Sequence, residues 1–368
     1  MAALEMKMKG NEVKQDRALT EKLVPKHKLI QLPQWGVAWL VLLPALVFLT
    51  LFMIYPIINT FFSAFVQGYH YTDGAGSFAL GQFVGGIKAK DGLSMTFGLS
   101  NFGELFAENQ TFAKSILNTA ILTIVEVPLT IIVSLLIATF LNSIKVLKGF
   151  YQTIFFLPYV TNSIALGLVF NVVFSNAPGG LMNILVQKFG GDPINWLSKN
   201  PHPSLKDVQE GATRFHQGVV IITYALWNGI AFKILVFMSG LATIDSQYYN
   251  AAKIDGASNF TIWRRITLPL LSPQILYITI TSFIGAFKMY TGVNAVYAKN
   301  SGATGNLAYW FGGTNGDEWI PVVGWIYKSV ANNADETGVA SAASLVLLGI
   351  IMVITAVQFA ASKKKVHY

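Results

Sequence analysis

NAAKIDGASNFTIWRRITLPLLSP, residues 250–273, is a polar segment in the middle of a strongly apolar chain. It contains one glycine and two prolines, and long apolar stretches lie on either side of it. Over all 368 residues, 53% are hydrophobic and only 12% are charged, whereas a soluble domain carries about 25% charged residues. Apolar windows long enough to cross a bilayer as helices recur along the chain. The composition therefore predicts an all-α integral membrane protein.

Six apolar segments are predicted to span the membrane. These spans are 36–66, 115–142, 150–174, 218–243, 271–298 and 338–361. Prolines within them do not argue against helices, because neighbouring helices can satisfy the backbone groups that a proline frees. The predicted organisation is a tail 1–35, a first span 36–66, a loop 67–114, a core 115–298 with a polar connection 244–270, a loop 299–337, a last span 338–361 and a basic end 362–368.

Lysine and arginine are distributed unevenly between the two sides of the membrane that these spans define. The tail, the connections 143–149 and 244–270, and the basic end together hold 15 basic residues in 76 positions. The connections on the other side hold nine in 130 positions. Because basic residues concentrate in cytoplasmic connections, both termini and the polar connection are predicted to be cytoplasmic. The formal charge of +8 is then a topology signal and does not indicate nucleic-acid binding.

The polar connection itself is predicted to form two short helices joined by a turn. Asp255-Gly256 is a turn signal, and Ser258 is placed to cap the second helix. Leu268-Pro269 and Ser272-Pro273 are predicted to interrupt the helix where the fifth span begins. Two interpretations remain open from this pattern: a docking surface for another protein, or an amphipathic hairpin lying on the membrane.

Residues 250–257, NAAKIDGA, together with ITLPLLSP at 266–273, resemble the EAA motif of ABC-importer permeases. That motif reads E-A-A-x-x-D-G-A followed by I-x-L-P-x-x-x-P. The run LLPALVFLTLFMIYPIINTFFSAF in the first span and FFLPYVTNSIALGLVF in the third are similar to the family of the larger maltose permease subunit. The resemblance implies six transmembrane helices in the type I ABC importer permease architecture, with both termini cytoplasmic.

In that family the EAA segment is a coupling helix between helices four and five, docked on a cytoplasmic ATPase subunit. Small alanines permit close approach, and the Asp-Gly turn sets the angle between the two short helices. Asn250 replaces the glutamate of the family pattern, so a charged contact to the ATPase becomes a neutral hydrogen bond, which is weaker. The residues implied in coupling are Asn250, Ala251, Ala252, Asp255, Gly256, Ala257, Leu268 and Pro269.

The resemblance also implies the partners. They are a second homologous permease, two cytoplasmic ATPase subunits and an extracytoplasmic solute-binding protein that delivers a carbohydrate. The chain has no G-x-x-x-x-G-K-[ST] motif, so the nucleotide site is expected on a separate subunit. We expect a multi-pass protein of the bacterial cytoplasmic membrane, in contact with lipid and without a cofactor of its own.

Three ionisable residues fall inside the predicted spans and are therefore candidates for function. Glu126 lies in the second span, Lys233 in the fourth and Lys288 in the fifth. A pair between Glu126 and either lysine would lower the cost of burying both charges. Alternatively, the lysines extend to the membrane surface.

Aromatic and amide side chains in spans four and five are candidates for sugar contact, because sugars present C–H faces to rings and hydroxyl groups to amides. The corresponding parts of these two spans contact substrate in the maltose permease subunit. Helix packing or an interfacial aromatic belt would also account for rings at these positions. The predicted substrate residues are Trp227, Asn228, Gly229, Phe232, Lys233, Phe287, Lys288, Tyr290, Thr291 and Asn294.

Two other function classes fit parts of the sequence. A proton-coupled secondary transporter would use Glu126, Lys233 and Lys288 as its relay, but the spans show no evident inverted halves. A membrane-embedded enzyme would need clustered carboxylates or histidine pairs in the spans, and the sequence shows neither. We therefore expect a permease and not an enzyme.

Overall fold

The computed structural model describes residues 34–67, 96–107, 111–144, 146–197, 214–297, 319–332 and 337–362. Most of the predicted tail and basic end, and large parts of the two predicted outer loops 67–114 and 299–337, lie outside these residues. The chain divides into two compact units, of which the first ends at Ile58 and the second begins at Asn59.

The first unit is a helical segment whose side chains are almost all apolar and exposed. It contains α2, Gln34–Leu49, the π-helical turn η1, Thr50–Ile54, and the beginning of α3, Tyr55–Phe65. A helix that is apolar on every side is typical of a segment surrounded by lipid. In η1 the Tyr55 N–H donates to the Thr50 carbonyl, five residues back, directly before Pro56.

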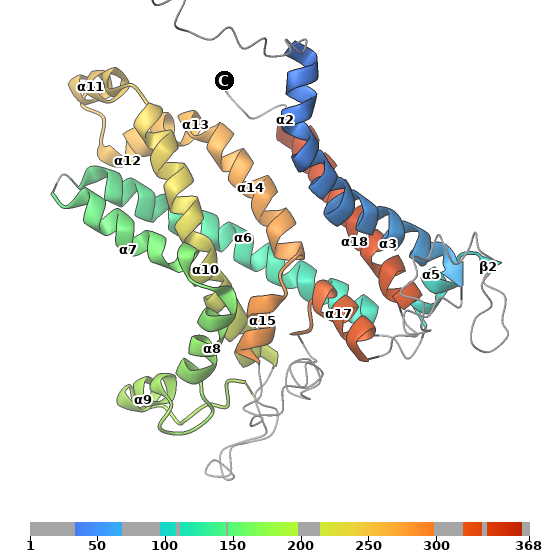
Figure 1. Cartoon of the computed structure of the whole chain (residues 1–368). Helices are drawn as coiled ribbons and strands as arrows, with labels where there is room; N and C mark the ends of the chain where they lie inside the picture. Colours follow the sequence, from blue (N-terminus) through green and yellow to red (C-terminus); the bar gives the residue numbers. More distant parts are fainter. Residues whose placement is uncertain are drawn as a thin grey trace, which may run out of the picture. The chain divides into compact units, whose positions relative to one another are not determined.

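The second unit is a bundle of helices with one small hairpin of strands (Figure 1). The strands β1 and β2 pair in antiparallel register, with Val66 opposite Phe97. The elements of this unit, after the end of α3, are β1 Val66–Gln67, β2 Thr96–Phe97, α5 Ser100–Glu104, α6 Phe112–Ser143, α7 Lys148–Val160, α8 Ser163–Val173, α9 Leu181–Lys188, α10 Arg214–Thr243, α11 Ser246–Ile254, α12 Asn259–Ile262, η3 Trp263–Thr267, α13 Leu268–Leu270, α14 Ser272–Phe287, α15 Thr291–Val296, α17 Val322–Asn332 and α18 Thr337–Ser362.

The centre of the second unit is the packing of α6 against α10, with α7 and α14 beside them (Figure 1). Leu135 and Ala138 of α6 belong to the same buried cluster as Ile234 and Phe237 of α10. In a membrane such packing acts mainly through van der Waals contact, because lipid tails are as apolar as the side chains. Small residues at the contact therefore matter, and Gly240 of α10 lies directly against the side chains of α14.

Within the described residues, four helices are long and apolar enough to span a membrane, or up to six when each of two bent helix pairs counts as one span. The prolines predicted to be tolerated do lie inside helices, with Pro44 in α2, Pro128 in α6 and Pro158 in α7. The four long helices are Trp35–Phe65, Phe112–Ser143, Arg214–Thr243 and Thr337–Ser362.

The predicted third span, 150–174, is not one helix but two. Its parts, α7 and α8, meet at an angle of 95°. Thr161 and Asn162 have extended ψ angles, and the Asn162 side chain accepts hydrogen bonds from the N–H groups of Ile164 and Ala165. Asn162 thus caps a new helix at the point where the first one ends.

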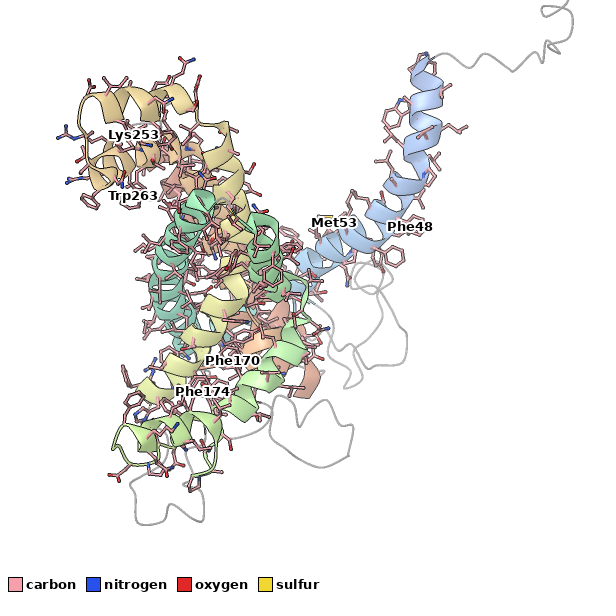
Figure 2. The ribbon with its side chains drawn as sticks, turned by 90° about the vertical axis from the view of Figure 1, so that its left-hand side faces the viewer. Phe48, Met53, Phe170, Phe174, Lys253 and Trp263 are labelled. Carbon is pink, nitrogen blue, oxygen red and sulfur yellow. The ribbon has the colours of Figure 1, made fainter. Side chains whose placement is uncertain are left out.

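The polar connection forms the predicted helix, turn and helix. Gly256 adopts a φ of +73° between α11 and α12, a conformation that glycine reaches without steric cost. Ser258 caps α12 by accepting from the Thr261 N–H. Figure 2 shows Lys253 and Trp263 of this segment at one end of the second unit, and Phe170 of α8 and Phe174 directly after it towards the other end.

The interruption predicted where the fifth span begins is present, although the helical segment continues through Leu268-Pro269 as far as Leu270. The π-helical turn η3 precedes Pro269, and in it the Leu268 N–H donates to the Trp263 carbonyl, five residues back. Such a turn lets a helix accommodate a local irregularity without ending. The chain bends at Leu271 instead, by 66°.

The predicted fifth span, 271–298, is also divided. The helix α14 ends at Phe287, residues 288–290 are not helical, and α15 begins at Thr291. Two of the predicted spans are therefore broken within the bundle. The polar backbone and side-chain groups at these breaks lie inside the predicted spans and not at their ends. Irregular backbone inside a membrane is tolerated where it is buried in protein or lines a cavity.

Candidate functional site

A cavity of about 600 Å³ lies where the two broken spans meet α6 and α10. Its wall includes Thr161 and Ser163 from the α7–α8 break, and Lys288 to Gly292 from the α14–α15 break. The volume falls within the range of small-molecule binding sites. Both helix breaks therefore open onto the same space.

Seven of the ten predicted substrate residues line this cavity. On α10, lining positions recur at the spacing of one helix face, from Ala225 through Asn228 and Gly229 to Phe232. The ionisable residue Glu126 of α6 lines it as well. The seven are Asn228, Gly229, Phe232, Lys233, Lys288, Tyr290 and Thr291.

The remaining three predicted substrate residues do not line the cavity. Trp227 is 50% exposed and lies on another face of α10, one helical step away from Asn228. Phe287 is buried in an apolar cluster with residues of α17 and α18. Asn294 is one turn into α15, where its N–H donates to the Tyr290 carbonyl.

Other lining residues were missed from the sequence, above all Tyr159, Thr161 and Ser163 of the third span. The signal that would have found them is the polar run at 159–163, directly after Pro158 and inside an otherwise apolar segment. Tyr224 was missed too, and its hydroxyl donates to the Ser163 carbonyl at 3.2 Å. That contact fixes α10 against the first turn of α8.

The helical segments that follow the two breaks, α8 and α15, pack closely against each other. The Ser163 and Thr291 hydroxyl oxygens are 3.3 Å apart, and the Asn171 amide donates to the Val296 carbonyl at 2.7 Å. A Cβ atom placed on Gly292 would overlap the Tyr224 ring. Only glycine fits at position 292, so this close packing depends on the absence of a side chain there.

Glu126 and Lys233 occupy the same part of the cavity wall. A Cβ atom placed on Gly229 would lie 3.0 Å from the Lys233 Nζ and 3.8 Å from the Glu126 Oε1. Both side chains are only 7% exposed. The Lys233 ammonium donates to the Gly229 carbonyl at 3.3 Å, and within the described part of the chain the buried Glu126 Oε2 has no hydrogen-bond partner. Gly229 thus leaves space for both charged groups.

Lys233 is therefore buried beside the cavity, and the interpretation that it extends to the membrane surface is wrong for this residue. Lys288 differs from it, because its side chain is exposed while it lines the cavity at the end of α14. The three ionisable residues that the sequence singled out converge on one space.

Stacked aromatic rings flank the charged groups. The rings of Tyr159 and Phe232 stack with centroids 5.6 Å apart, joining α7 to α10. Tyr290 stacks on Tyr327 of α17 at 5.2 Å. The cavity therefore combines aromatic faces with hydroxyl, amide and charged groups, which is the set of contacts that a polyhydroxylated molecule needs. Among the described residues there is no group of three or more His, Cys, Asp or Glu that could hold a metal ion.

Six of the residues predicted to act in coupling, from Asn250 to Ala257, lie on the hairpin formed by α11 and α12, and Leu268 and Pro269 lie in α13. Asn250, Ala251, Asp255 and Gly256 are exposed, and a Cβ atom on Gly256 would meet no atom within 4 Å. The other four predicted residues, Ala252, Ala257, Leu268 and Pro269, are half-buried.

Side chains behind the exposed tip attach the hairpin to the bundle. The Tyr249 and Thr267 hydroxyl oxygens are 3.3 Å apart, and the Trp263 Nε1 donates to the Thr139 hydroxyl at 3.4 Å. Thr139 belongs to α6, which also carries Glu126 of the cavity. The tip of the hairpin is therefore open to a partner while its base is fixed to a helix that reaches the cavity.

The model of the family "Binding-protein-dependent transport system inner membrane component" matches residues 130–366. The chain belongs to this family. The match includes the hairpin and nearly all of the cavity wall, and it confirms the resemblance to ABC-importer permeases drawn from the sequence. A membrane component of a transport system moves its substrate without transforming it, which agrees with the prediction that the chain is not an enzyme.

Individual relatives support the same assignment of the chain to this family. The chain is 31% identical to the arabinooligosaccharides transport system permease protein AraP of Bacillus subtilis, over 70% of this chain and 73% of the relative. It is 28% identical to the lactose transport system permease protein LacF of Rhizobium radiobacter, over 89% of this chain and 94% of the relative. These similarities support an importer permease and give no support to the proton-coupled alternative.

A solved structure shares the fold of this permease component. It is the crystal structure of a bacterial alginate ABC transporter in complex with an alginate pentasaccharide-bound periplasmic protein. The match has a TM-score of 0.67 and 18% identity, and it covers 89% of this chain and 94% of that one. At this identity the likeness shows the fold alone.

Proposed function

We propose that this chain is a permease subunit of an ATP-driven importer and that its cavity holds a carbohydrate on the way across the membrane. The observation that carries the substrate class is the cavity wall, where the stacked rings of Tyr159 and Phe232 and the ring of Tyr290 accompany hydroxyl, amide and charged groups. Relatives whose names specify arabinooligosaccharides and lactose support the same class.

In this proposal the chain crosses the membrane six times, with each bent helix pair counted as one span. The excess of basic residues on one side supports cytoplasmic termini and a cytoplasmic hairpin. Helix α11 and the Asp255-Gly256 turn then face the cytoplasm, and the breaks at 161–162 and 288–290 lie at membrane depth. Midway sites formed by broken helices are a recurring solution in transporters.

The hairpin is the proposed docking site for an ATPase subunit. Its tip is exposed, it carries the small residues Ala251 and Ala252, and its turn is fixed by the positive φ of Gly256. Its base is bonded to α6 through Trp263 and Thr139. A displacement of the tip would therefore reach the helix that carries Glu126.

The remaining partners follow from the family. An importer of this kind needs a second permease, two ATPase subunits and a binding protein that delivers the substrate from outside. The crystallised alginate transporter, which shares the fold, was solved with a substrate-bound periplasmic protein. The outer connections 67–114 and 299–337 are the proposed contacts for such a protein here.

Isolation of the chain from its native membranes in mild detergent tests this assembly. We expect a second permease and an ATPase subunit to co-purify, identified by mass spectrometry, in a ratio of two permeases to two ATPases. The purified complex should hydrolyse ATP faster when the loaded binding protein is added. A chain that purifies alone and still transports solute in proteoliposomes would contradict the proposal.

A further inference from the structure

Among the described residues, three charged side chains line the cavity, and their signs do not balance. Glu126 contributes one negative charge, and Lys233 and Lys288 contribute one positive charge each. The other described residues of its wall are uncharged. Such an excess matters most where protein replaces water, because a lower local dielectric strengthens each electrostatic interaction.

Glu126 and Lys233 offset each other. The Lys233 Nζ lies 3.0 Å and the Glu126 Oε1 lies 3.8 Å from the point where a Cβ on Gly229 would stand, and both side chains are buried. A nearby opposite charge reduces the cost of burying each group. A ligand that used the Glu126 carboxylate alone would leave Lys233 uncompensated. The pair therefore counts as one neutral unit in the wall.

Lys288 has no such counter-charge. Its side chain is exposed at the cavity, and in the described part of the chain its ammonium forms no hydrogen bond or ion pair. The carboxyl end of α14 adds partial negative charge nearby, but the amino end of α8 at Ser163 adds partial positive charge to the same wall. The partial charges of these two helix ends oppose each other. The described wall therefore keeps its excess of one positive charge.

We propose that the carbohydrate held by this cavity carries a single carboxylate, as a uronic acid does, and that Lys288 binds it. This inference rests on the proposed function and specifies its substrate class. The carboxylate would accept charge-assisted hydrogen bonds from the Lys288 ammonium, while the sugar hydroxyls meet Asn228 and the Glu126–Lys233 pair. The stacked rings of Tyr159 and Phe232 would meet the C–H face of the sugar.

A carboxylate fits the charge excess better than a phosphate. One unpaired ammonium balances one negative charge, whereas a phosphate monoester carries about 1.5 to 2 negative charges at neutral pH. The remainder of the phosphate charge would have no opposite charge among the described residues of the cavity wall.

Direct binding to the purified complex, without the solute-binding protein, tests this charge selection. The probes are cellobiose, cellobiouronate and cellobiose phosphorylated at one primary hydroxyl, which share one disaccharide frame. We expect cellobiouronate to bind at least about tenfold more tightly than cellobiose, as one charge-assisted hydrogen bond provides. The Lys288→Met variant should reduce that preference to within about twofold. Lys188→Met, at an exposed position at the end of α9, is the matched control and should retain the preference.

Equal affinity for cellobiose and cellobiouronate would overturn the inference, as would a preference that survives Lys288→Met. Tighter binding of the phosphorylated sugar would overturn the choice of a carboxylate. Binding of cellobiose alone would leave the carbohydrate permease intact while removing the charge selection. Failure of the co-purification experiment would instead remove the proposed function itself, so the two failures are distinguishable.

Glu126→Gln provides a second and opposite variant. It removes the counter-charge of Lys233 and leaves two unpaired ammonium groups at the cavity. We expect the preference for cellobiouronate over cellobiose to increase by about threefold or more relative to the native complex. A preference that fell in this variant would overturn the charge balance on which the inference is built.

Discussion

The hairpin and the cavity of this permease are specified by the sequence in different ways. The hairpin comes from one continuous segment, in which Gly256 and Ser258 set the turn and the cap through local hydrogen bonds and backbone preference. The cavity comes from helices that are distant in sequence and meet only through packing, as Tyr224 and Gly292 do. The turn and the cap of the hairpin can be altered without disturbing the cavity. A packing contact near the cavity cannot be altered without changing the shape of the cavity.

Gly292→Ala is expected to have the largest effect. Its Cβ would overlap the Tyr224 ring, so α15 must move, and Tyr290 and Thr291 move with it. Overpacking of this kind costs about 1–3 kcal/mol, which corresponds to a loss of sugar affinity of about 5- to 150-fold. Isothermal titration of the purified complex measures it, with Gly349→Ala as control because that position has open space. ATPase co-purification should be unchanged, and its loss would show that the two regions are not separable.

Gly256→Val is the reciprocal change. A β-branched residue is strongly disfavoured at a φ of +73°, at a cost of about 1–3 kcal/mol. We expect about tenfold weaker retention of the ATPase subunit, measured by co-purification, while sugar binding stays native. Gly349→Val, in the helix α18, is the matched control. Weakened sugar binding in Gly256→Val would contradict the local character of the hairpin.

Phe232→Leu removes one ring of the stack with Tyr159 while keeping an apolar side chain at the cavity. Aromatic pairs contribute about 0.5–1.5 kcal/mol beyond area burial. We expect sugar affinity to fall by about fivefold with ATP hydrolysis unaffected. The exposed Phe189→Leu is the control. An unchanged affinity would show that this stack supports helix packing and not the ligand.

Asn250→Glu restores the acidic residue of the family pattern at the exposed start of the motif. A surface charge pair contributes about 0.2–1 kcal/mol, so ATPase retention should rise by about twofold. Because the pair is exposed, the gain should decrease in high salt. A variant whose coupling and ATPase retention equal the native values would show that position 250 forms no charged contact with the ATPase subunit.

The sequence predicted the hairpin well because its signals are local. Asp255-Gly256 and Ser258 act within a few residues, and the structure has the predicted turn and cap. Of the two prolines expected to interrupt the helix, Pro269 lies inside it, and the bend falls at Leu271, before Pro273. The sequence did not predict the π-helical turn before Pro269.

The cavity could be predicted only in part. Ionisable residues in apolar spans stand out in the sequence because a charge is costly to place inside a membrane. Glu126, Lys233 and Lys288 do line the cavity. Trp227 does not, because neighbouring residues on a helix point about 100° apart and the facing side is fixed only by packing. Tyr159 joins the wall through the 95° bend after α7, which the sequence did not predict.

Uptake into proteoliposomes that contain the purified complex tests the central claim most directly. A labelled carbohydrate, loaded on the binding protein, should enter only when ATP is enclosed with the ATPase subunits. Collapse of the proton gradient should leave the rate unchanged, and Gly256→Val should reduce it, as its weaker retention of the ATPase subunit requires. Uptake that proceeds without ATP and ceases when the proton gradient is dissipated would contradict an ATP-driven importer and direct attention to Glu126 as a proton carrier.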